Sequence, residues 1–438
     1  MALHERRSCA ACQTRDAVVG IGNPFYPRVT GKNGNVIHFD GSPHLLAGGN
    51  DYLNLATHPR VRQAAKDAID EFGVGTTGSP LMNGHMALHE RLAAELAAWV
   101  GKEAAMVFTT GYLANLGAIG ELGQMNPRSM IAIRDESAHA SLIDGMRLGG
   151  VRGWKFKHND MNSLRRRLER ARERTDKILI VVDGVYSTEG DIAPLPDIVE
   201  LAERYGAEIF LDDAHGFGVI AEGRGTAAHF GLADRVGYIS ATFSKSCGAS
   251  GGFVAASREV IQHFEARCSP HMFVASLPPA MTAATLASLQ IMRDEPQRHA
   301  RVMAVADTLR AKLRNLGFTV GGETPIVPVF MIGMFGSLRD PDIQALTHDD
   351  EDTQARLREE ALRHKDTLGT FRAQRWLMKR GIYVNPFIPP GSIDPLLRLS
   401  VTDAYTPGDV RKIVDAFDEM RHMIPALAGS PTLLVDAD

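Results

Sequence analysis

The sequence predicts an α/β protein with a mainly parallel sheet sandwiched by helices and a smaller α+β C-terminal domain. From about residue 104 to 256, short apolar runs alternate with segments of helical spacing. Continuous apolar strands are typical of parallel sheets, because helices cover both faces of such sheets. The length of 438 residues indicates one large and one smaller domain. A content of 44% apolar and 23% charged residues is ordinary for a globular chain.

Six apolar runs are expected to form the large sheet: AAMVFTTG, SMIAIRD, KILIVVDGVYS, AEIFLDDAHG, VGYISATFSK and GGFVAAS. Helical spacing between them is clearest in MNSLRRRLERARERT and LPDIVELAERYG. We expect residues 281–316 to form one long helix that leads into the second domain. In that domain, TPIVPVFM and RLSVTDAYT are predicted strands, and TPGDVRKIVDAFDEM is a predicted helix with Pro407 near its first turn.

These elements divide the chain into three parts. They are an N-terminal segment (1–55), a large domain (56–309) and a small C-terminal domain (310–438). Residues from about 335 to 370 are expected to be an inserted surface segment of the small domain. Its acidic run, HDDED, is interpreted as a solvated face rather than as a metal site.

Composition excludes several classes of function. A net charge of −4 without a basic stripe gives no reason to expect nucleic-acid binding. No apolar run approaches the roughly 20 residues of a membrane-spanning helix, and the N-terminus lacks the apolar core of a secretion signal. Four cysteines argue for a reducing compartment, so we expect a cytoplasmic protein. Cys9 and Cys12 form a lone CxxC without a second pair nearby, so no metal is expected.

Polar residues follow the predicted strands at the sheet edge where ligands bind in such folds. They are Asp135, Ser187, Asp212, His215, Thr242 and Lys245. A lysine amine there can form a Schiff base with an aldehyde cofactor, most often pyridoxal phosphate. The alternative for Lys245 is a solvated loop lysine, which is the usual state of this residue type.

Pyridoxal phosphate places further demands on a protein, and the sequence offers a candidate for each. Asp212 could keep the ring nitrogen protonated, and His215 could donate to the phenolic oxygen. The segment TTGYLAN turns from a strand into a helix at Gly111, and a helix start binds phosphate. Taken alone, DDAH could be a strand-end carboxylate with a packed histidine, and TTGY could be a helix cap. Their order along the chain favours a cofactor site.

At these residues the chain resembles the α-oxoamine synthases, which are fold-type I pyridoxal-phosphate enzymes. The family includes 8-amino-7-oxononanoate synthase, 2-amino-3-ketobutyrate CoA ligase and serine palmitoyltransferase. The resemblance runs from about residue 45 to 420. It is carried by GGNDYLNLATHP, DESAHASLIDG, DGVYSTEGDIAPL, DDAHGFG, TFSK and PPGSIDPLLRLSVTDAYT.

The resemblance implies a role for each matched residue. It implies that the catalytic residues are Lys245, His139, Asp212 and His215. The cofactor-binding residues would be Gly111, Tyr112, His139, Ser187, Asp212, His215, Thr242 and Lys245. His139 would stack on the ring, and Asn50 and Arg398 would hold the substrate carboxylate, since a guanidinium binds carboxylates with two parallel hydrogen bonds.

The implied reaction joins an amino acid to an acyl thioester, from coenzyme A or a carrier protein, and gives an α-amino ketone, usually with decarboxylation. The implied assembly is a homodimer. One alternative is glycine acyltransfer of the 2-amino-3-ketobutyrate CoA ligase type, which keeps the carboxylate. A second is a fold-type I aminotransferase, which would usually stack an aromatic residue where this chain has His139. A third, a catalytically silent subunit, would lack Lys245.

The chain departs from the family pattern at several positions. Tyr405 stands where the family usually has histidine. In FVASLPP, Val274 and Ala275 cannot make the hydroxyl contacts that reach the neighbouring subunit's phosphate, although Ser276 remains. Residues 79–85 match no named member well. NPFYPRV, residues 23–29, resembles a segment of serine palmitoyltransferases and favours a longer acyl chain, while the amino acid stays open.

Overall fold

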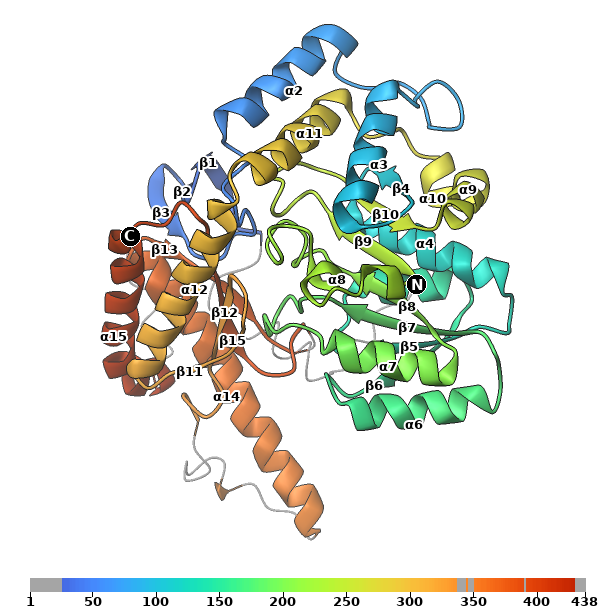
Figure 1. The fold of residues 1–438 in the computed structure, drawn as a ribbon. Coiled ribbons are helices and arrows are strands. Elements are labelled where there is room, and N and C mark those ends of the chain that lie inside the picture. The colour runs from blue at the N-terminus through green and yellow to red at the C-terminus, as the bar shows by residue number, and fades with distance from the viewer. Residues whose placement is uncertain (1–25, 337–343, 346–349, 390, 430–438) are drawn as a thin grey trace, which may run out of the picture.

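The computed structural model describes residues 26–336, 344–345, 350–389 and 391–429. Cys9, Cys12 and the start of NPFYPRV lie outside the described residues, as does part of HDDED. The fold has a large central sheet covered by helices and a second group of elements built on two smaller sheets (Figure 1).

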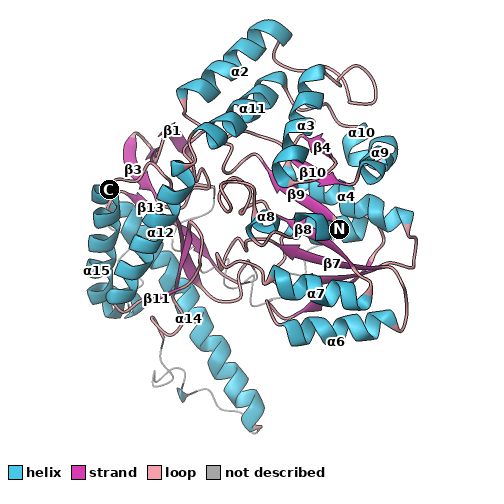
Figure 2. Cartoon of the chain, viewed as in Figure 1, coloured by secondary structure: helices cyan, strands magenta, loops and turns pink. Residues whose placement is uncertain are grey.

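The large sheet has seven strands in the order β4-β10-β9-β8-β7-β5-β6, and helices lie on both sides of it (Figure 2). The strands are β4 (Ala104–Phe108), β5 (Ile131–Asp135), β6 (Arg152–Phe156), β7 (Ile178–Asp183), β8 (Glu208–Asp212), β9 (Tyr238–Thr242) and β10 (Gly252–Ala256). All neighbours pair in parallel except those of β10. The mainly parallel sheet predicted from the sequence is therefore confirmed.

Alternate residues of β7 belong to two different hydrophobic clusters. Leu179 and Val181 pack with residues of α4 (Gly111–Met125), α5 (Ala140–Leu148) and α9 (Arg258–Arg267). Ile180 and Val182 pack with α3 (Ala87–Val100), α6 (Met161–Arg172) and α7 (Leu195–Tyr205). Side chains alternate between the two faces of a strand. The continuous apolar run of β7 therefore reflects burial of both faces.

The two smaller sheets are built from strands near both ends of the described chain. One has the order β11-β12-β15-β14, and the other has the order β1-β2-β3-β13. Their bounds are β1 (Val29–Asn33), β2 (Val36–Phe39), β3 (Ser42–Leu46), β11 (Thr319–Val320), β12 (Ile326–Phe330), β13 (Ile382–Tyr383), β14 (Asn385–Phe387) and β15 (Leu396–Ser400). β3 pairs in parallel with β13, so the N-terminal strands pack with the C-terminal part. The chain also contains α2 (Pro59–Phe72), α8 (Thr226–His229), η1 (Ala233–Arg235) and α10 (Ser269–Met272).

The prediction of one long helix over residues 281–316 is wrong. The structure has α11 (Pro279–Asp294) and α12 (Gln297–Asn315). Pro296 causes the break, because proline lacks an N–H and disfavours helical dihedrals in the residue before it. Glu295 accordingly has φ −128° and ψ 57°. α11 packs against α2, whereas α12 packs against α15 (Pro407–Gly429), so the break redirects the chain between the two parts (Figure 1).

The expected surface insertion contains the start of a long helix, α14 (Glu351–Lys379). Asp350 caps the helix by accepting a hydrogen bond from Thr353 N at 2.8 Å. The first turns extend away from the body of the protein (Figure 1), whereas Phe371, near the other end, is fully buried. Asp366 accepts hydrogen bonds from Gly333 N and Phe335 N. The helix therefore runs from a projecting end into the part of the fold that contains α15 and the strands β13, β14 and β15.

Two carboxylates hold the ring of His158 just beyond β6. Its Nδ1 lies 3.0 Å from Asp135 Oδ1, and its Nε2 lies 3.0 Å from Asp191 Oδ2. Burial lowers the pKa of His158, but the hydrogen bonds and charges of the two carboxylates outweigh burial and raise it to about 10. The imidazolium therefore ties the end of β5 to the turn that contains Ser187.

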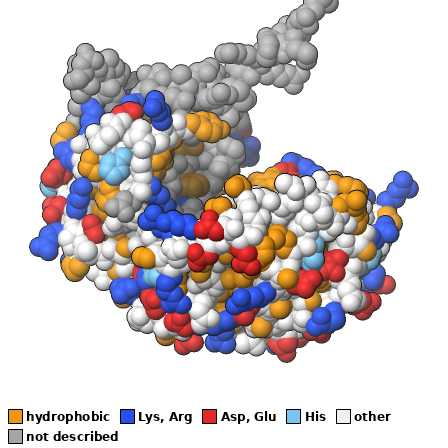
Figure 3. All heavy atoms as spheres, turned by 90° about the horizontal axis from the view of Figure 1, so that it is seen from above, with side chains coloured by type: hydrophobic (Ala, Val, Ile, Leu, Met, Phe, Trp, Pro, Cys, Tyr) orange, Lys and Arg blue, Asp and Glu red, His pale blue; other side chains and the backbone are white. Residues whose placement is uncertain are grey.

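The face seen in Figure 3 carries lysine, arginine and acidic side chains interspersed with hydrophobic ones. Within the described residues, no helix combines the length and apolar character that a membrane crossing requires.

We expect His158→Gln to destabilise the fold by about 3 kcal/mol at pH 6, because it leaves the buried Asp135 and the partly buried Asp191 without their cation. Since the folded-state pKa is raised, the contribution of the charge is complete below about pH 6.5 and disappears as the pH rises towards 10. Urea unfolding at several pH values measures the difference, with the exposed His229→Gln as the control. A penalty that is constant from pH 6 to 10 would contradict the assignment.

Candidate active site

A cavity of about 180 Å³ lies at the carboxyl ends of β7, β8 and β9. The eight residues predicted to bind the cofactor all line it: Gly111, Tyr112, His139, Ser187, Asp212, His215, Thr242 and Lys245. Segments more than 130 residues apart in the sequence meet here because parallel strands end at the same edge of a sheet.

Lys245 follows β9 in a tight turn. Gly248 in this turn has φ +63°, and a Cβ on it would lie 2.2 Å from Ala56 N, so the turn requires glycine. Burial lowers the pKa of the Lys245 amine to about 8; the charge of Asp212 opposes this shift, and the charge of Arg398 adds to it. The amine is therefore easier to deprotonate than an ordinary lysine.

Asp212 ends β8 and is 4% exposed. Its Oδ1 accepts a hydrogen bond from Ala214 N at 3.0 Å, and its Oδ2 accepts one from Asn115 Nδ2 at 2.6 Å. It forms no ion pair with any described lysine or arginine. A buried carboxylate held only by neutral donors suits a cationic ring nitrogen.

Asn115 was not predicted from the sequence. It lies one turn into α4 and also donates to Ser141 Oγ, while its Oδ1 accepts from Ser240 Oγ at 2.6 Å. These bonds leave the side chain a single orientation towards Asp212. The available signal was a polar residue on the buried face of an apolar helix.

The N-terminus of α4 forms another wall of the cavity. Thr110 caps the helix by accepting from Leu113 N, and Gly111 begins it. A Cβ on Gly111 would lie 2.6 Å from Thr242 Cβ, so only glycine fits here. The Oγ1 of Thr242 donates to Gly251 O at 3.0 Å. Free helix N–H groups beside a hydroxyl make a suitable phosphate cradle.

His139 lies at the mouth of the cavity and caps α5. Its Nδ1 lies 2.7 Å from Ser141 Oγ, and its backbone N–H donates to Asp183 Oδ1 at 3.2 Å. The ring of Tyr112 stands edge-on to His139, with 6.3 Å between the ring centroids, and its hydroxyl donates to Asp144. These contacts fix the imidazole at the cavity wall.

Asp183 is a second buried carboxylate in the cavity wall and was also not predicted. Asp183 and Asp212 lie opposite each other in the register of the parallel strands β7 and β8. Burial and the charge of Asp212 raise the pKa of Asp183 well above its usual value. Asp183 therefore keeps its proton more readily than an ordinary aspartate.

The two residues predicted to bind substrate, Asn50 and Arg398, lie outside this wall but are linked to it. Arg398 Nη2 donates to Asn50 Oδ1 at 2.9 Å and to Tyr52 OH at 3.3 Å. Tyr52 OH in turn lies 2.6 Å from His215 Nδ1. Arg398 is 3% exposed, and its Nε has no hydrogen-bond partner among the described residues. A buried guanidinium with a free donor suits a carboxylate ligand.

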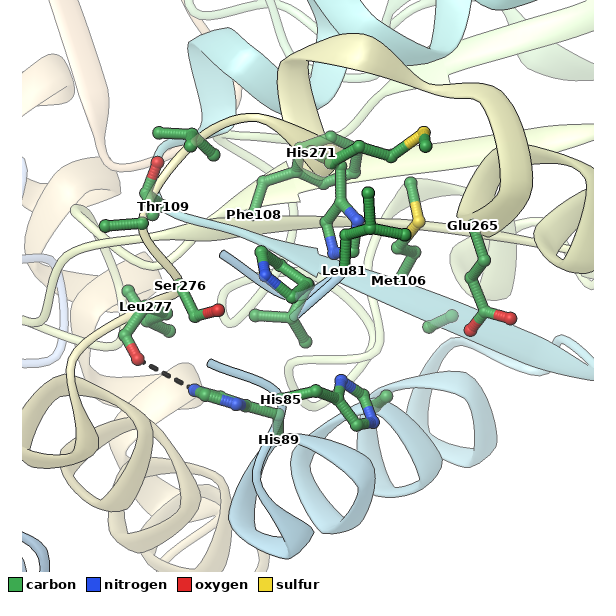
Figure 4. Close-up of a pocket in the computed structure, with 17 residues that line it drawn as sticks. Leu81, His85, His89, Met106, Phe108, Thr109, Glu265, His271, Ser276 and Leu277 are labelled. Atoms are coloured by element: carbon green, nitrogen blue, oxygen red, sulfur yellow. Dashed lines mark hydrogen bonds between the residues drawn. The ribbon is translucent and has the colours of Figure 1, made fainter. Parts of the chain in front are cut away.

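A second cavity, of about 300 Å³, lies along the edge strand β4 (Figure 4). His89 Nε2 donates to Leu277 O at 2.7 Å, and its Nδ1 accepts from Met86 N, so this ring is neutral. Burial lowers the pKa of His271 to about 4. Ser276, the hydroxyl retained from the family pattern, lines this cavity and does not reach the first one.

One group of three described side chains could reach a common metal ion: His158, Glu189 and Asp191. Both nitrogens of His158 already lie against carboxylates, which assigns this group to the ion-pair cluster described above. Cys9 and Cys12 lie outside the described residues.

The cavity residues fit pyridoxal phosphate. They provide an amine, a buried carboxylate and a helix N-terminus around one small space, and these groups would hold the cofactor's aldehyde, ring nitrogen and phosphate. Together with the seven-stranded sheet, they define a pyridoxal-phosphate-dependent transferase of fold type I.

Comparison with known proteins agrees with this class. The aminotransferase class I and II family matches residues 45–417. Serine palmitoyltransferase from Bacteriovorax stolpii is 33% identical over 401 residues, which cover 91% of this chain and 87% of that protein. The enzyme of the same name from Sphingobacterium spiritivorum is 36% identical over 395 residues, which cover 89% of this chain and 90% of that protein.

A solved serine palmitoyltransferase from Sphingomonas wittichii superposes with a TM-score of 0.83 at 28% identity, covering 97% of this chain and all of that chain. 8-Amino-7-oxononanoate synthase from Fervidobacterium nodosum is 42% identical over 286 residues, covering 64% of this chain and 72% of that protein. The chain belongs to the α-oxoamine synthases, within the aminotransferase class I and II family.

The protein is accordingly a pyridoxal-phosphate-dependent acyltransferase that condenses an amino acid with an acyl thioester. When bound, pyridoxal phosphate supplies an electron sink for the electron pair that proton removal leaves behind.

We expect Lys245 of the apoprotein to react with an acylating reagent such as acetic anhydride with a midpoint near pH 8. Peptide mass spectrometry after trace labelling gives the rate at each pH, with the exposed Lys66 as the internal reference for the reagent. In Asp212→Ala the midpoint should fall further, because a charge that raises the pKa of Lys245 is removed. A midpoint above pH 10 in the wild type would contradict the lowered pKa of Lys245.

Proposed function

We propose that the amino acid is serine and that the acyl donor is a long-chain acyl thioester, with release of the thiol and carbon dioxide. The likeness to serine palmitoyltransferases over about nine tenths of the chain carries this proposal. The carboxylate-binding geometry of Arg398 and Asn50 supports an amino-acid substrate.

We assign the following roles to the residues of the cavity. Lys245 Nζ removes the α-proton, which suits an amine with a pKa near 8. Asp212 holds the ring nitrogen in its protonated form, and His215 donates to the phenolic oxygen, with Ser187 beside it. His139 covers one face of the ring. The phosphate is held by Gly111, Tyr112 and Thr242.

A second candidate is an activity of the 8-amino-7-oxononanoate synthase type. The identity of 42% to one such synthase favours it, although over a shorter stretch of 286 residues. Glycine acyltransfer that keeps the carboxylate, and amino transfer, share the lysine and aspartate. All four activities differ in the amino acid used or in whether thiol and carbon dioxide are released.

We also propose that the enzyme works as a homodimer in the cytoplasm. Ser276 Oγ is buried without a hydrogen-bond partner among the described residues and lines a cavity other than the cofactor cavity. This placement supports a contact with a neighbouring subunit. The free, buried Cys247 and Cys268 suit a reducing compartment. Sedimentation at twice the chain mass would support the dimer, and sedimentation at the monomer mass would oppose it.

A substrate panel tests the proposed function. The holoenzyme is incubated with serine, glycine or alanine and with acyl-CoAs of increasing chain length, while thiol and carbon dioxide release are measured. We expect serine with palmitoyl-CoA to give the highest kcat/KM and equal amounts of both products. Preference for another amino acid would reject serine. Thiol release without carbon dioxide would reject decarboxylation, and amino transfer without thiol release would favour an aminotransferase.

We expect Arg398→Lys to raise the KM for the amino acid by roughly 10- to 100-fold, with a smaller change in kcat. The reason is the loss of a charge-assisted hydrogen bond worth about 1.5–3 kcal/mol. Steady-state kinetics measure the effect, and Arg310→Lys serves as the control because Arg310 is equally buried but lies away from the cavity. An unchanged KM in Arg398→Lys would contradict carboxylate binding at this residue.

A further inference from the structure

We propose that Tyr52 is a positioning residue that fixes the proton of His215 on Nε2 and connects this histidine to the carboxylate-binding Arg398. The inference requires only that His215 lines the cofactor cavity, and it does not depend on which amino acid is the substrate.

A chain of hydrogen bonds joins the two residues. Tyr52 OH lies 2.6 Å from His215 Nδ1, the shorter of its two contacts. Arg398 Nη2 lies 3.3 Å from the same oxygen and 2.9 Å from Asn50 Oδ1. Both contacts of the Tyr52 hydroxyl lie in the interior, since Tyr52 is fully buried, Arg398 is 3% exposed and His215 is 6% exposed. A ligand on Arg398 would therefore be two hydrogen bonds away from the ring of His215.

The direction of each hydrogen bond follows from the chemistry of its partners. A guanidinium only donates, so the oxygen of Tyr52 accepts from Arg398, and its single proton points to His215. Burial raises the pKa of Tyr52 to about 12, so the hydroxyl keeps that proton. His215 Nδ1 must then accept. A neutral imidazole that accepts at one nitrogen carries its proton on the other.

Burial and the surrounding positive charges keep the ring of His215 neutral. Burial lowers its pKa well below the usual value, and the positive charges of Lys245, Arg398 and His139 lower it further. A neutral ring has one donor only. Tyr52 therefore decides which nitrogen offers that donor, and Nε2 is the nitrogen left for the cavity.

Tyr52 is held rigidly enough to perform this role. Its carbonyl accepts from Asp403 N at 2.9 Å. Its ring packs in a cluster with side chains from the turn after β7, the loop after β8 and β12: Val185, Val219, Ile220 and Ile326. The hydroxyl is thus anchored from both parts of the molecule.

The first test is the tautomer of His215 in the apoprotein, measured by NMR with ¹⁵N-labelled histidine and assigned through the loss of the signal in His215→Gln. We expect the wild type to show protonated Nε2 and unprotonated Nδ1. In Tyr52→Phe, which keeps the ring, we expect a mixture of both tautomers. Protonated Nδ1 in the wild type would overturn the proposal without any variant.

The second test is the absorbance of the bound cofactor as a function of pH. In Tyr52→Phe, His215 no longer has its proton fixed on Nε2 and is a weaker donor to the phenolic oxygen of the cofactor. The negative charge of that oxygen is then less stabilised, so the midpoint pH of the absorbance change should rise by about one unit, as the loss of one hydrogen bond predicts. Tyr405→Phe is the matched control. Tyr405 is also buried, and its hydroxyl donates to Leu46 O at 2.8 Å, away from His215.

An unchanged tautomer and an unchanged midpoint in Tyr52→Phe would also overturn the proposal, as would equal shifts in Tyr52→Phe and Tyr405→Phe. If Tyr52→Phe does not fold, the wild-type tautomer decides alone. Failure of the serine assignment in the substrate panel would leave both readouts intact, so the two proposals are tested separately.

Discussion

The buried negative charge of Asp212 is the interaction on which the rest of the site depends. A carboxylate at the end of a central strand is costly unless donors and a cation surround it. Asn115 and the N–H of Ala214 supply the donors. In the proposed site, the cofactor's ring nitrogen would supply the cation. On the neighbouring strand, burial and the charge of Asp212 raise the pKa of Asp183 well above its usual value. Asp183 also accepts a hydrogen bond from the backbone N–H of His139. Asp212 thus connects β8 to α4, and Asp183 connects β7 to the residue that caps α5.

The outline of this site could be predicted because its residues stand where apolar runs end. Asp212 and Lys245 follow strands whose apolar residues predict burial. His139 and Arg398 were identified through the resemblance to a family. Asp183 carried the same signal as Asp212, since it ends the run ILIVVD, but it was not singled out. Asn115 and Tyr52 were less visible, because their roles depend on partners about 100 and 160 residues away.

In the fold, too, elements with a local sequence pattern could be predicted, whereas contacts between distant segments could not. The six apolar runs form strands, whereas β6 was not predicted, because this edge strand has exposed and charged positions and lacks an apolar run. The single helix predicted over 281–316 overlooked Pro296, a local signal that was available in the sequence. The pairing of β3 with β13 could not be predicted, since neither short strand has a pattern that specifies its partner.

The pairing of β3 with β13 has a consequence for the order in which the enzyme is made. Residues 42–46 leave the ribosome early, but their partner strand at 382–383 and Arg398 follow only near the end of synthesis. The large sheet, complete by residue 256, can assemble first. Contacts of such high sequence separation form slowly. We therefore expect the large sheet to form during translation before β3 can pair with β13 and before Asn50 can bind Arg398.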